Sequence, residues 1–232
     1  MSTGPLIVNG VEIPPGTRET LRIPVGRRYT SREVLLPVSV IHGAKPGPRL
    51  FVSAAIHGDE INGVEIIRRL LQRPQLKKLK GALIAVPIVN VYGFLAQTRY
   101  LPDRRDLNRC FPGSAKGSLA ARLANTFLEE IASVATHGID LHTGSLHRTN
   151  LPQVRASLED AETEEMAHAF GAPVILDSSQ RPGSLRHAMD ELGIPLILYE
   201  AGEALRFDDL AIKAGLNGVI SVMRHLGMLP RV

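Results

Sequence analysis

The stretch "RLFVSAAIHGDEINGVEIIRRLL", residues 49–71, decides how this chain folds. Residues 49–57 form a short, almost continuous apolar run, which is typical of a buried β-strand. From Val64 to Leu71 the apolar residues recur at helical spacing, and Pro74 sets the end of that helix. His57 and Glu60 fall where the strand gives way to the helix. In α/β proteins, functional residues gather at such strand ends.

The rest of the chain repeats this alternation of strands and helices. Strands are predicted at residues 32–43, 49–57, 81–89, 137–142, 172–177 and 194–200. Helices are predicted at residues 62–73, 118–136, 159–170, 184–192 and 208–226. Several strands are continuous apolar runs, which favour a sheet covered by helices on both faces. We therefore predict an α/β fold in a single domain, residues 1–232, with His57, His142 and Glu200 at strand ends along one edge of the sheet.

The composition is that of a globular protein: 232 residues, of which 44% are hydrophobic and 22% are charged. A single cysteine, Cys110, excludes an intrachain disulfide and favours a reducing compartment. The N-terminus lacks the apolar core of a signal peptide, and no apolar run is long enough to span a bilayer. We therefore expect a cytoplasmic protein with no membrane partner; its oligomeric state is not predicted.

The net charge of +4 is compatible with a nucleic-acid partner or with a small anionic substrate. Aromatic residues make up only 4% of the chain, and there is no tryptophan to stack on bases. We therefore expect a small anionic substrate or an acidic peptide, and no nucleic acid. A nucleic-acid-binding protein would instead show affinity that falls steeply with salt.

His57, Glu60 and His142 form a candidate zinc site. A catalytic zinc ion commonly takes three protein ligands, and two histidines with one glutamate is a known set. His57 and Glu60 are close enough to bind one ion from a single turn, and "DLHTG" supplies His142 from a later strand. Asp140 lies two residues before His142, on the same face of that strand, and could orient a ligand. Either motif alone is weak, because His-x-x-Glu pairs occur often by chance.

Four ordered motifs carry a resemblance to a known family: "HGDE" at residues 57–60, "TRY" with "RDLNRCFPG" at 98–113, "DLHTG" at 140–144 and "YEAG" at 199–202. Together they resemble the succinylglutamate desuccinylase/aspartoacylase family, a branch of the zinc carboxypeptidase-like hydrolases. The resemblance covers most of the chain except about the first forty residues. It implies a mixed, largely parallel β-sheet of the zinc carboxypeptidase-like type and one Zn²⁺ per chain.

The resemblance implies a role for each matched residue. His57, Glu60 and His142 would bind Zn²⁺, which lowers the pKa of a bound water toward about 7. Glu200 would promote attack by water and then protonate the leaving amine, a double role that a raised carboxyl pKa would suit. Its alternative is a surface glutamate or an ion-pair partner. The expected reaction is hydrolysis of an amide bond in a carboxylate-bearing, N-acyl amino acid substrate.

Three further residues are implied around the substrate. Arg99 matches the arginine that stabilises the developing oxyanion. Asn108 and Arg109, in "DLNR", match the pair that binds a substrate carboxylate, for which the planar guanidinium is well suited. Asp106 is expected to brace this loop. Cys110 is expected to be a packing residue, although a thiolate nucleophile in this electropositive setting stays an alternative.

The chain departs from the family pattern after its last predicted helix, where members usually carry a second, β-rich domain. That domain narrows the entrance in aspartoacylase-like members, so we expect a more open site here. A carboxypeptidase acting on C-terminal acidic residues of peptides therefore stays an alternative. A non-catalytic metal-binding member is a further alternative, although the family motif positions are all filled.

Overall fold

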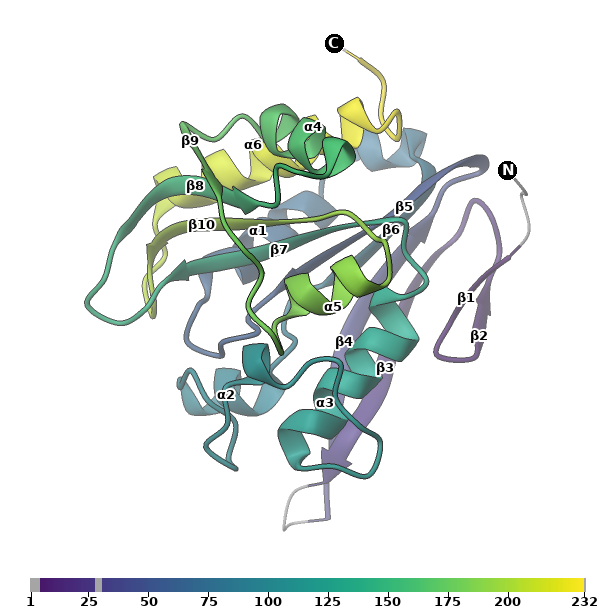
Figure 1. Ribbon diagram of the computed structural model, residues 1–232. Helices are drawn as coiled ribbons and strands as arrows, with labels where there is room; N and C mark the ends of the chain where they lie inside the picture. Colours follow the sequence, from purple (N-terminus) through teal and green to yellow (C-terminus); the bar gives the residue numbers. More distant parts are fainter. Residues whose placement is uncertain (1–4, 28–30, 232) are drawn as a thin grey trace.

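The computed structural model describes residues 5–27 and 31–231 (Figure 1). Its strands are β1 (Leu6–Val8), β2 (Val11–Ile13), β3 (Arg18–Arg27), β4 (Glu33–His42), β5 (Lys45–Ala54), β6 (Lys80–Val86), β7 (His137–Gly144), β8 (Asn150–Ala156), β9 (Val174–Asp177) and β10 (Leu196–Glu203). Its α-helices are α1 (Asn62–Leu71), α2 (Val91–Ala96), α3 (Leu119–Phe127), α4 (Ala161–Phe170), α5 (Leu185–Glu191) and α6 (Asp209–His225). Short 3₁₀ turns at Pro74–Lys78 and Leu107–Arg109, and a π-helical turn at Leu128–Ala132, complete the described elements.

An eight-stranded mixed sheet organises the molecule, in the order β3-β4-β6-β5-β7-β10-β8-β9. The four central strands, β6, β5, β7 and β10, are parallel to one another. Strands β3 and β4 extend one side of the sheet in antiparallel pairing, and β8 joins β10 antiparallel on the other side. The predicted mixed, largely parallel sheet is confirmed. The parallel strands end together, and their carboxyl ends therefore form one edge on which a site can be assembled.

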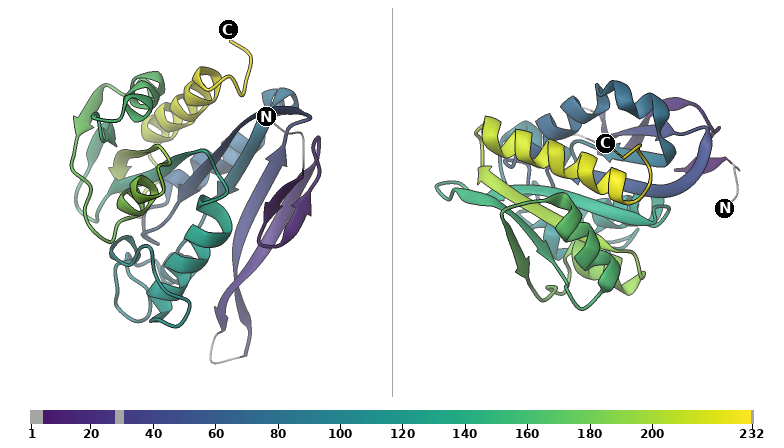
Figure 2. Two further views of the ribbon diagram at one scale, coloured as in Figure 1. Left: turned by 45° about the vertical axis from the view of Figure 1, so that its right-hand side comes forward. Right: turned by 90° about the horizontal axis from the view of Figure 1, so that it is seen from above.

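Helices cover both faces of the sheet, as predicted (Figures 1 and 2). Helices α3 and α5 and the β1–β2 hairpin pack on one face, around Phe51 and Phe127. Helices α1, α4 and α6 pack on the other face, around Ile66 and Tyr199. Because both faces are covered, β7 is buried along its whole length, and the apolar runs of β5 and β6 are buried as well.

Helix α1 lies unusually close to the two strands that precede the site. A β-carbon at Gly63 would come 2.7 Å from that of Ala54 on β5 and 2.8 Å from that of Leu141 on β7. Only glycine permits this approach of helix to sheet. The residues just before α1, including Glu60, are thereby held against the carboxyl ends of β5 and β7.

Strands β1, β2, β3 and β8 and helix α2 were not predicted from the sequence. Pro24 and Gly26 in β3 suggest a turn, but the strand lies at the edge of the sheet and carries a bulge between these residues. Pro152 interrupts β8 in the same way, and the irregular pairing between Glu200 and Gly202 of β10 accommodates it. The predicted strand that ends at His142 in fact continues to Gly144.

Among the described residues, none of the helices combines the length and the apolar character needed to cross a lipid bilayer.

Candidate metal centre

A tight turn after β5 brings His57 and Glu60 together. The amide of Glu60 donates to the carbonyl oxygen of His57 at 3.1 Å, and the His57 Nδ1 lies 2.7 Å from the Glu60 Oε1. Gly58 lets the turn pack on α2, because a β-carbon there would fall 2.0 Å from the carbonyl carbon of Gly93. Both side chains of the pair are buried, so the turn aims two ligand-type groups into the protein and not into bulk solvent.

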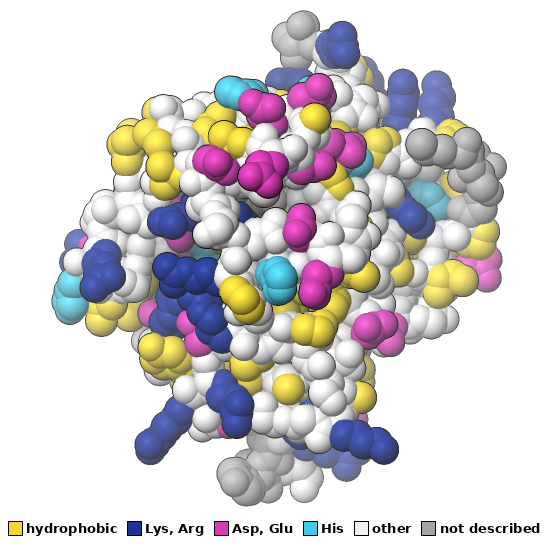
Figure 3. Space-filling view, in the orientation of Figure 1, with side chains coloured by type: hydrophobic (Ala, Val, Ile, Leu, Met, Phe, Trp, Pro, Cys, Tyr) yellow, Lys and Arg dark blue, Asp and Glu magenta, His cyan; other side chains and the backbone are white. Residues whose placement is uncertain are grey.

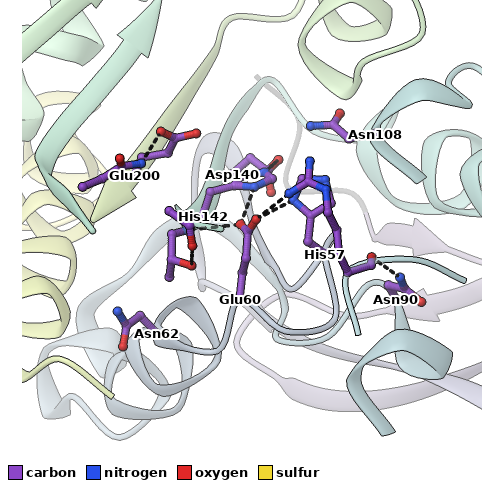
Figure 4. Close-up of polar contacts among 12 residues, drawn as sticks. His57, Glu60, Asn62, Asn90, Asn108, Asp140, His142 and Glu200 are labelled. Atoms are coloured by element: carbon purple, nitrogen blue, oxygen red, sulfur yellow. Dashed lines mark hydrogen bonds and ion pairs between the residues drawn. The ribbon is translucent and has the colours of Figure 1, made fainter. Parts of the chain in front are cut away.

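His142 completes the cluster from β7. Its Nδ1 lies 2.8 Å from the Glu60 Oε2, so the one carboxylate lies between the two imidazoles (Figure 4). His57, Glu60 and His142 each offer a ligand atom, and these atoms all lie within 4.8 Å of one another. The structure therefore brings together the three residues predicted as metal ligands, although two come from the turn after β5 and one from β7.

Each imidazole contacts a second carboxylate through its Nε2, the ring nitrogen that does not face Glu60. Asp140, which is wholly buried, contacts the His142 Nε2 at 2.7 Å and accepts a hydrogen bond from the Ser53 hydroxyl at 2.8 Å. Asp106 contacts the His57 Nε2 at 3.1 Å. Such contacts fix the ring orientation and leave Nδ1 as the coordinating atom of both histidines. Two nitrogens and one carboxylate, backed in this way, fit a zinc ion well.

The charges within the cluster compensate one another. Burial would raise the pKa of Glu60, but the two imidazoles outweigh burial and hold the pKa of that carboxyl well below its ordinary value. Burial would lower the pKa of His57, but Glu60 and Asp106 outweigh it and raise that pKa. Burial is likewise outweighed at His142, where Asp140 and Glu60 raise the pKa well above its ordinary value. Without a cation, the buried carboxylates therefore favour the protonated form of both imidazoles.

Arg99 lies beside the cluster and not out in solvent. Its guanidinium donates to the Glu60 Oε1 and to the Asp106 Oδ2, both at 3.1 Å. Burial would raise the pKa of Asp106, but His57 and Arg99 outweigh it and hold that pKa well below its ordinary value. Asp106 also accepts from the Asn108 amide at 2.9 Å, so it braces the loop as predicted. It contacts His57 as well, a contact that the sequence did not predict.

Glu200 lies on β10, next to His142 of β7 in the register of the sheet. Its Oε2 accepts hydrogen bonds from three side chains of β8: Asn150 at 2.8 Å, Gln153 at 3.2 Å and Arg155 at 3.1 Å. These hydrogen bonds, one of them from a charged group, hold the Glu200 side chain in place. The sequence predicted Glu200 and missed its three partners, because β8 itself was missed.

These groups open into one cleft of about 470 Å³. Six arginines line it: Arg99, Arg109, Arg148, Arg155, Arg181 and Arg186. Three carboxylates line it as well: Glu60, Asp140 and Glu200. Lys and Arg side chains gather on this face of the molecule (Figure 3). The cleft therefore favours an anionic ligand.

The predicted substrate pair, Asn108 and Arg109, lines this cleft. The Asn108 Oδ1 accepts from the amide of Leu185 at 2.9 Å, which leaves its amide nitrogen as the group available to a ligand. Arg109 is exposed, and its guanidinium donates to the Asn108 carbonyl oxygen. The amide and the guanidinium are both donors, and a carboxylate accepts from such groups.

Arg186 is a cleft residue that the sequence did not reveal, since "GSLRH" shows only the start of a helix. It is 8% exposed and donates to the hydroxyl and the carbonyl oxygen of Ser178. Within the described part of the chain, no carboxylate forms an ion pair with it. Burial, together with the Arg155 guanidinium, lowers the pKa of Arg186. A buried guanidinium in this setting gains from an anionic ligand.

Asn62 links the segment that carries the metal ligands His57 and Glu60 to the segment that follows Glu200. Its amide nitrogen donates to the Ala201 carbonyl oxygen at 3.3 Å, and its Oδ1 accepts from the Asp208 amide at 3.0 Å. Asn62 is the first residue of α1, two positions after Glu60, whereas Ala201 follows Glu200. This buried side chain therefore fixes the metal-ligand turn relative to the strand that carries Glu200.

Comparison with known proteins agrees with this geometry. Residues 46–226 match the model of the succinylglutamate desuccinylase/aspartoacylase catalytic domain. The chain belongs to this family. The resemblance carried by the four sequence motifs is thereby confirmed, and the matched range contains every predicted site residue.

The family includes relatives of known chemistry and structure. The chain is 31% identical over 218 residues to the N-alpha-acetyl-L-2,4-diaminobutyric acid deacetylase of Halomonas elongata, a match that covers 90% of this chain. It spans only 64% of that relative's length. A succinylglutamate desuccinylase/aspartoacylase from Rhodobacter sphaeroides superposes with a TM-score of 0.83 at 28% identity, over 93% of this chain and 67% of the other. A succinylglutamate desuccinylase from Silicibacter sp. TM1040 superposes with a TM-score of 0.85 at 27% identity, over 100% of this chain and 73% of the other.

Proposed function

We propose that this chain is a zinc-dependent hydrolase that removes the acyl group from a carboxylate-bearing N-acyl amino acid. The observation that carries the proposal is the buried cluster of His57, Glu60 and His142, whose ligand atoms lie within 4.8 Å of one another. The deacetylase from Halomonas elongata, with 31% identity, supports the same reaction class. A zinc ion bound there would activate water and polarise the scissile carbonyl.

The chain's own residues supply the remaining steps of the proposed reaction. Glu200 takes a proton from the attacking water and delivers it to the amide nitrogen as the carbon–nitrogen bond breaks. The products are a carboxylic acid and a free amine. Arg99 stabilises the negative charge that develops on the carbonyl oxygen, and its contact with Glu60 already places it beside the metal ligands.

Donor groups of the cleft bind the substrate's own acidic groups in this proposal. Asn108 and Arg109 bind one carboxylate by donating hydrogen bonds to it. Arg186 offers a second anionic position, because its guanidinium is buried without a carboxylate of its own among the described residues. Diaminobutyrate, in contrast, carries a second amine. We expect the arginines of the cleft to disfavour that cationic side chain and to favour an acidic one.

The test is a substrate panel offered to the zinc-loaded protein, with released amine as the readout. The panel pairs N-acetyl and N-succinyl derivatives of aspartate, glutamate and 2,4-diaminobutyrate with short peptides that end in glutamate or aspartate. Turnover of the acidic N-acyl amino acids that a chelator abolishes supports the proposal. Turnover of the peptides alone would replace it with carboxypeptidase activity, and binding without turnover would indicate a non-catalytic member.

Two variants separate the roles of metal and base. His142→Ala is expected to lose both zinc and activity. Glu200→Gln is expected to keep zinc at wild-type stoichiometry and to lose activity by about 10²- to 10⁴-fold, the usual contribution of a general base. Near-normal turnover in zinc-loaded Glu200→Gln would show that the proton is handled by another group.

A further inference from the structure

Strand β8 places three hydrogen-bond donors on a single oxygen of Glu200. The donors are the side-chain amides of Asn150 and Gln153 and the Arg155 guanidinium, at 2.8, 3.2 and 3.1 Å from Oε2. Among the described residues, none donates a hydrogen bond to the other oxygen, Oε1. Glu200 lines the cleft that contains the metal cluster. One oxygen is thus fully engaged while the other stays available.

The strand geometry explains why the three donors converge. Gln153 lies directly opposite Glu200 in the antiparallel pairing, and Arg155 lies opposite Leu198, two residues along on the same face. The irregular register between Glu200 and Gly202 brings Asn150 within reach as well. The alternate residues Val154 and Ala156 are buried in the core on the opposite face and hold β8 in this register.

Glutamate needs such restraint if it is to act on one defined water. The terminal torsion of a glutamate side chain is broad, so an unrestrained carboxylate rotates and presents either oxygen. The charged donor of Arg155 on Oε2 removes that freedom. Arg155 makes this contact even though its Nε is buried without a hydrogen-bond partner in the described part of the chain. The guanidinium is therefore positioned to contact Glu200 even though one of its own donors is left without a hydrogen bond.

We propose that Arg155 is a positioning residue, assisted by Asn150 and Gln153, that fixes Glu200 so that Oε1 alone faces the reacting water. This inference rests on the proposed hydrolase function. In the proposed step, Oε1 accepts the proton of the attacking water and passes it to the leaving nitrogen. Arg155 exchanges no proton in this step and acts through Glu200, although it also lines the cleft.

The first test compares Arg155→Gln with a matched control, Arg68→Gln. Arg68 also pairs with a glutamate, Glu65, at 2.6 Å, but it lies on the exposed surface of α1 away from the cleft. We expect Arg155→Gln to lower kcat by about 10- to 100-fold, as is usual for the loss of a group that orients a reacting side chain, with KM changed less than about threefold. Arg68→Gln should leave both unchanged. A raised KM with unchanged kcat would make Arg155 a substrate-binding residue and overturn the proposal.

Rescue and coupling provide the second test. Arg155→Lys should recover part of the lost kcat, because the contact is a single hydrogen bond from one nitrogen and does not need the planar fork. In a Glu200→Gln background, Arg155→Gln should cause no further loss of turnover. An equal additional loss in that background would show that Arg155 acts independently of Glu200 and would refute the proposal.

A double-mutant cycle measured by thermal unfolding tests the contact between Arg155 and Glu200 independently of the hydrolase function. Thermal unfolding of the wild type, Arg155→Met, Glu200→Gln and the double variant measures the coupling of the two side chains without any substrate. A shift for the double variant that is smaller than the sum of the single shifts supports the contact. Additive shifts overturn it. If the wild type hydrolyses nothing in the panel, the function fails on that result, while this cycle still decides whether Arg155 fixes Glu200.

Discussion

Asp140→Asn is the substitution that tests most directly how the buried carboxylates prepare the metal site. Asp140 is wholly buried and contacts both the Ser53 hydroxyl and the His142 Nε2. An asparagine has the same shape. Its oxygen can accept from the imidazole, and its amide can donate to the hydroxyl, since a hydroxyl both donates and accepts. The substitution therefore removes one charge and leaves the hydrogen bonds in place.

The magnitude follows from that loss of charge. Removing a carboxylate that backs a metal-binding histidine typically costs about 10- to 100-fold in metal affinity, or about 1.4 to 2.7 kcal/mol. Because Asp140 is shielded from salt and water, we expect a loss near the upper end, about 100-fold. Ser53→Ala is the matched control. It removes one hydrogen bond to Asp140 but keeps the charge, so its loss should stay below about 10-fold.

The assay is a competition titration of zinc between the protein and a chromophoric chelator of known affinity. Circular dichroism of each metal-free variant confirms that the fold is retained. A folded Asp140→Asn protein with wild-type zinc affinity would refute the argument that Asp140 increases the basicity of His142. A larger effect of Ser53→Ala than of Asp140→Asn would assign the role to the hydroxyl.

Three further predictions concern other parts of the site. The pKa values of His57 and His142 are raised above the ordinary imidazole value in the metal-free protein, which favours the protonated rings. Zinc must displace protons from these rings, so its affinity should rise as the pH rises above the ordinary imidazole pKa of about 6.5, with proton release seen as a buffer-dependent heat of binding. Gly58→Ala should destabilise the fold by about 3 kcal/mol in denaturant unfolding, because the new methyl group would meet the Gly93 backbone at 2.0 Å. Burial raises the pKa of Cys110, so iodoacetamide should react slowly and spare turnover, whereas early inactivation would revive a thiolate mechanism.

Local patterns explain what the sequence predicted well. The strand, turn and helix of residues 49–71 follow from periodicity alone, and the turn places His57 and Glu60 three residues apart. His142 could be added because the carboxyl ends of parallel strands meet at one edge. The metal cluster was therefore predictable from two short motifs and one rule about sheets.

Contacts between segments far apart in the chain explain what was missed. Asp106 reaches His57 across 49 residues, and no spacing in the sequence reveals that pair. The sequence did not predict β8, because Pro152 suggests a loop, although buried and more exposed residues alternate along the strand. The roles of Asn150, Gln153 and Arg155 were therefore missed. An irregularity in the pairing of β8 with β10 lets the strand form despite this proline.

The Asn62 bridge has a consequence for any attempt to graft this constellation onto an unrelated scaffold. A transplant that copied the metal ligands and the glutamate of β10 would lack a buried side chain that bonds the segment after Glu200 to the start of α1. The smallest portable unit thus includes an asparagine that meets neither ion nor substrate. A design that kept only the metal ligands and the general base would leave this asparagine out.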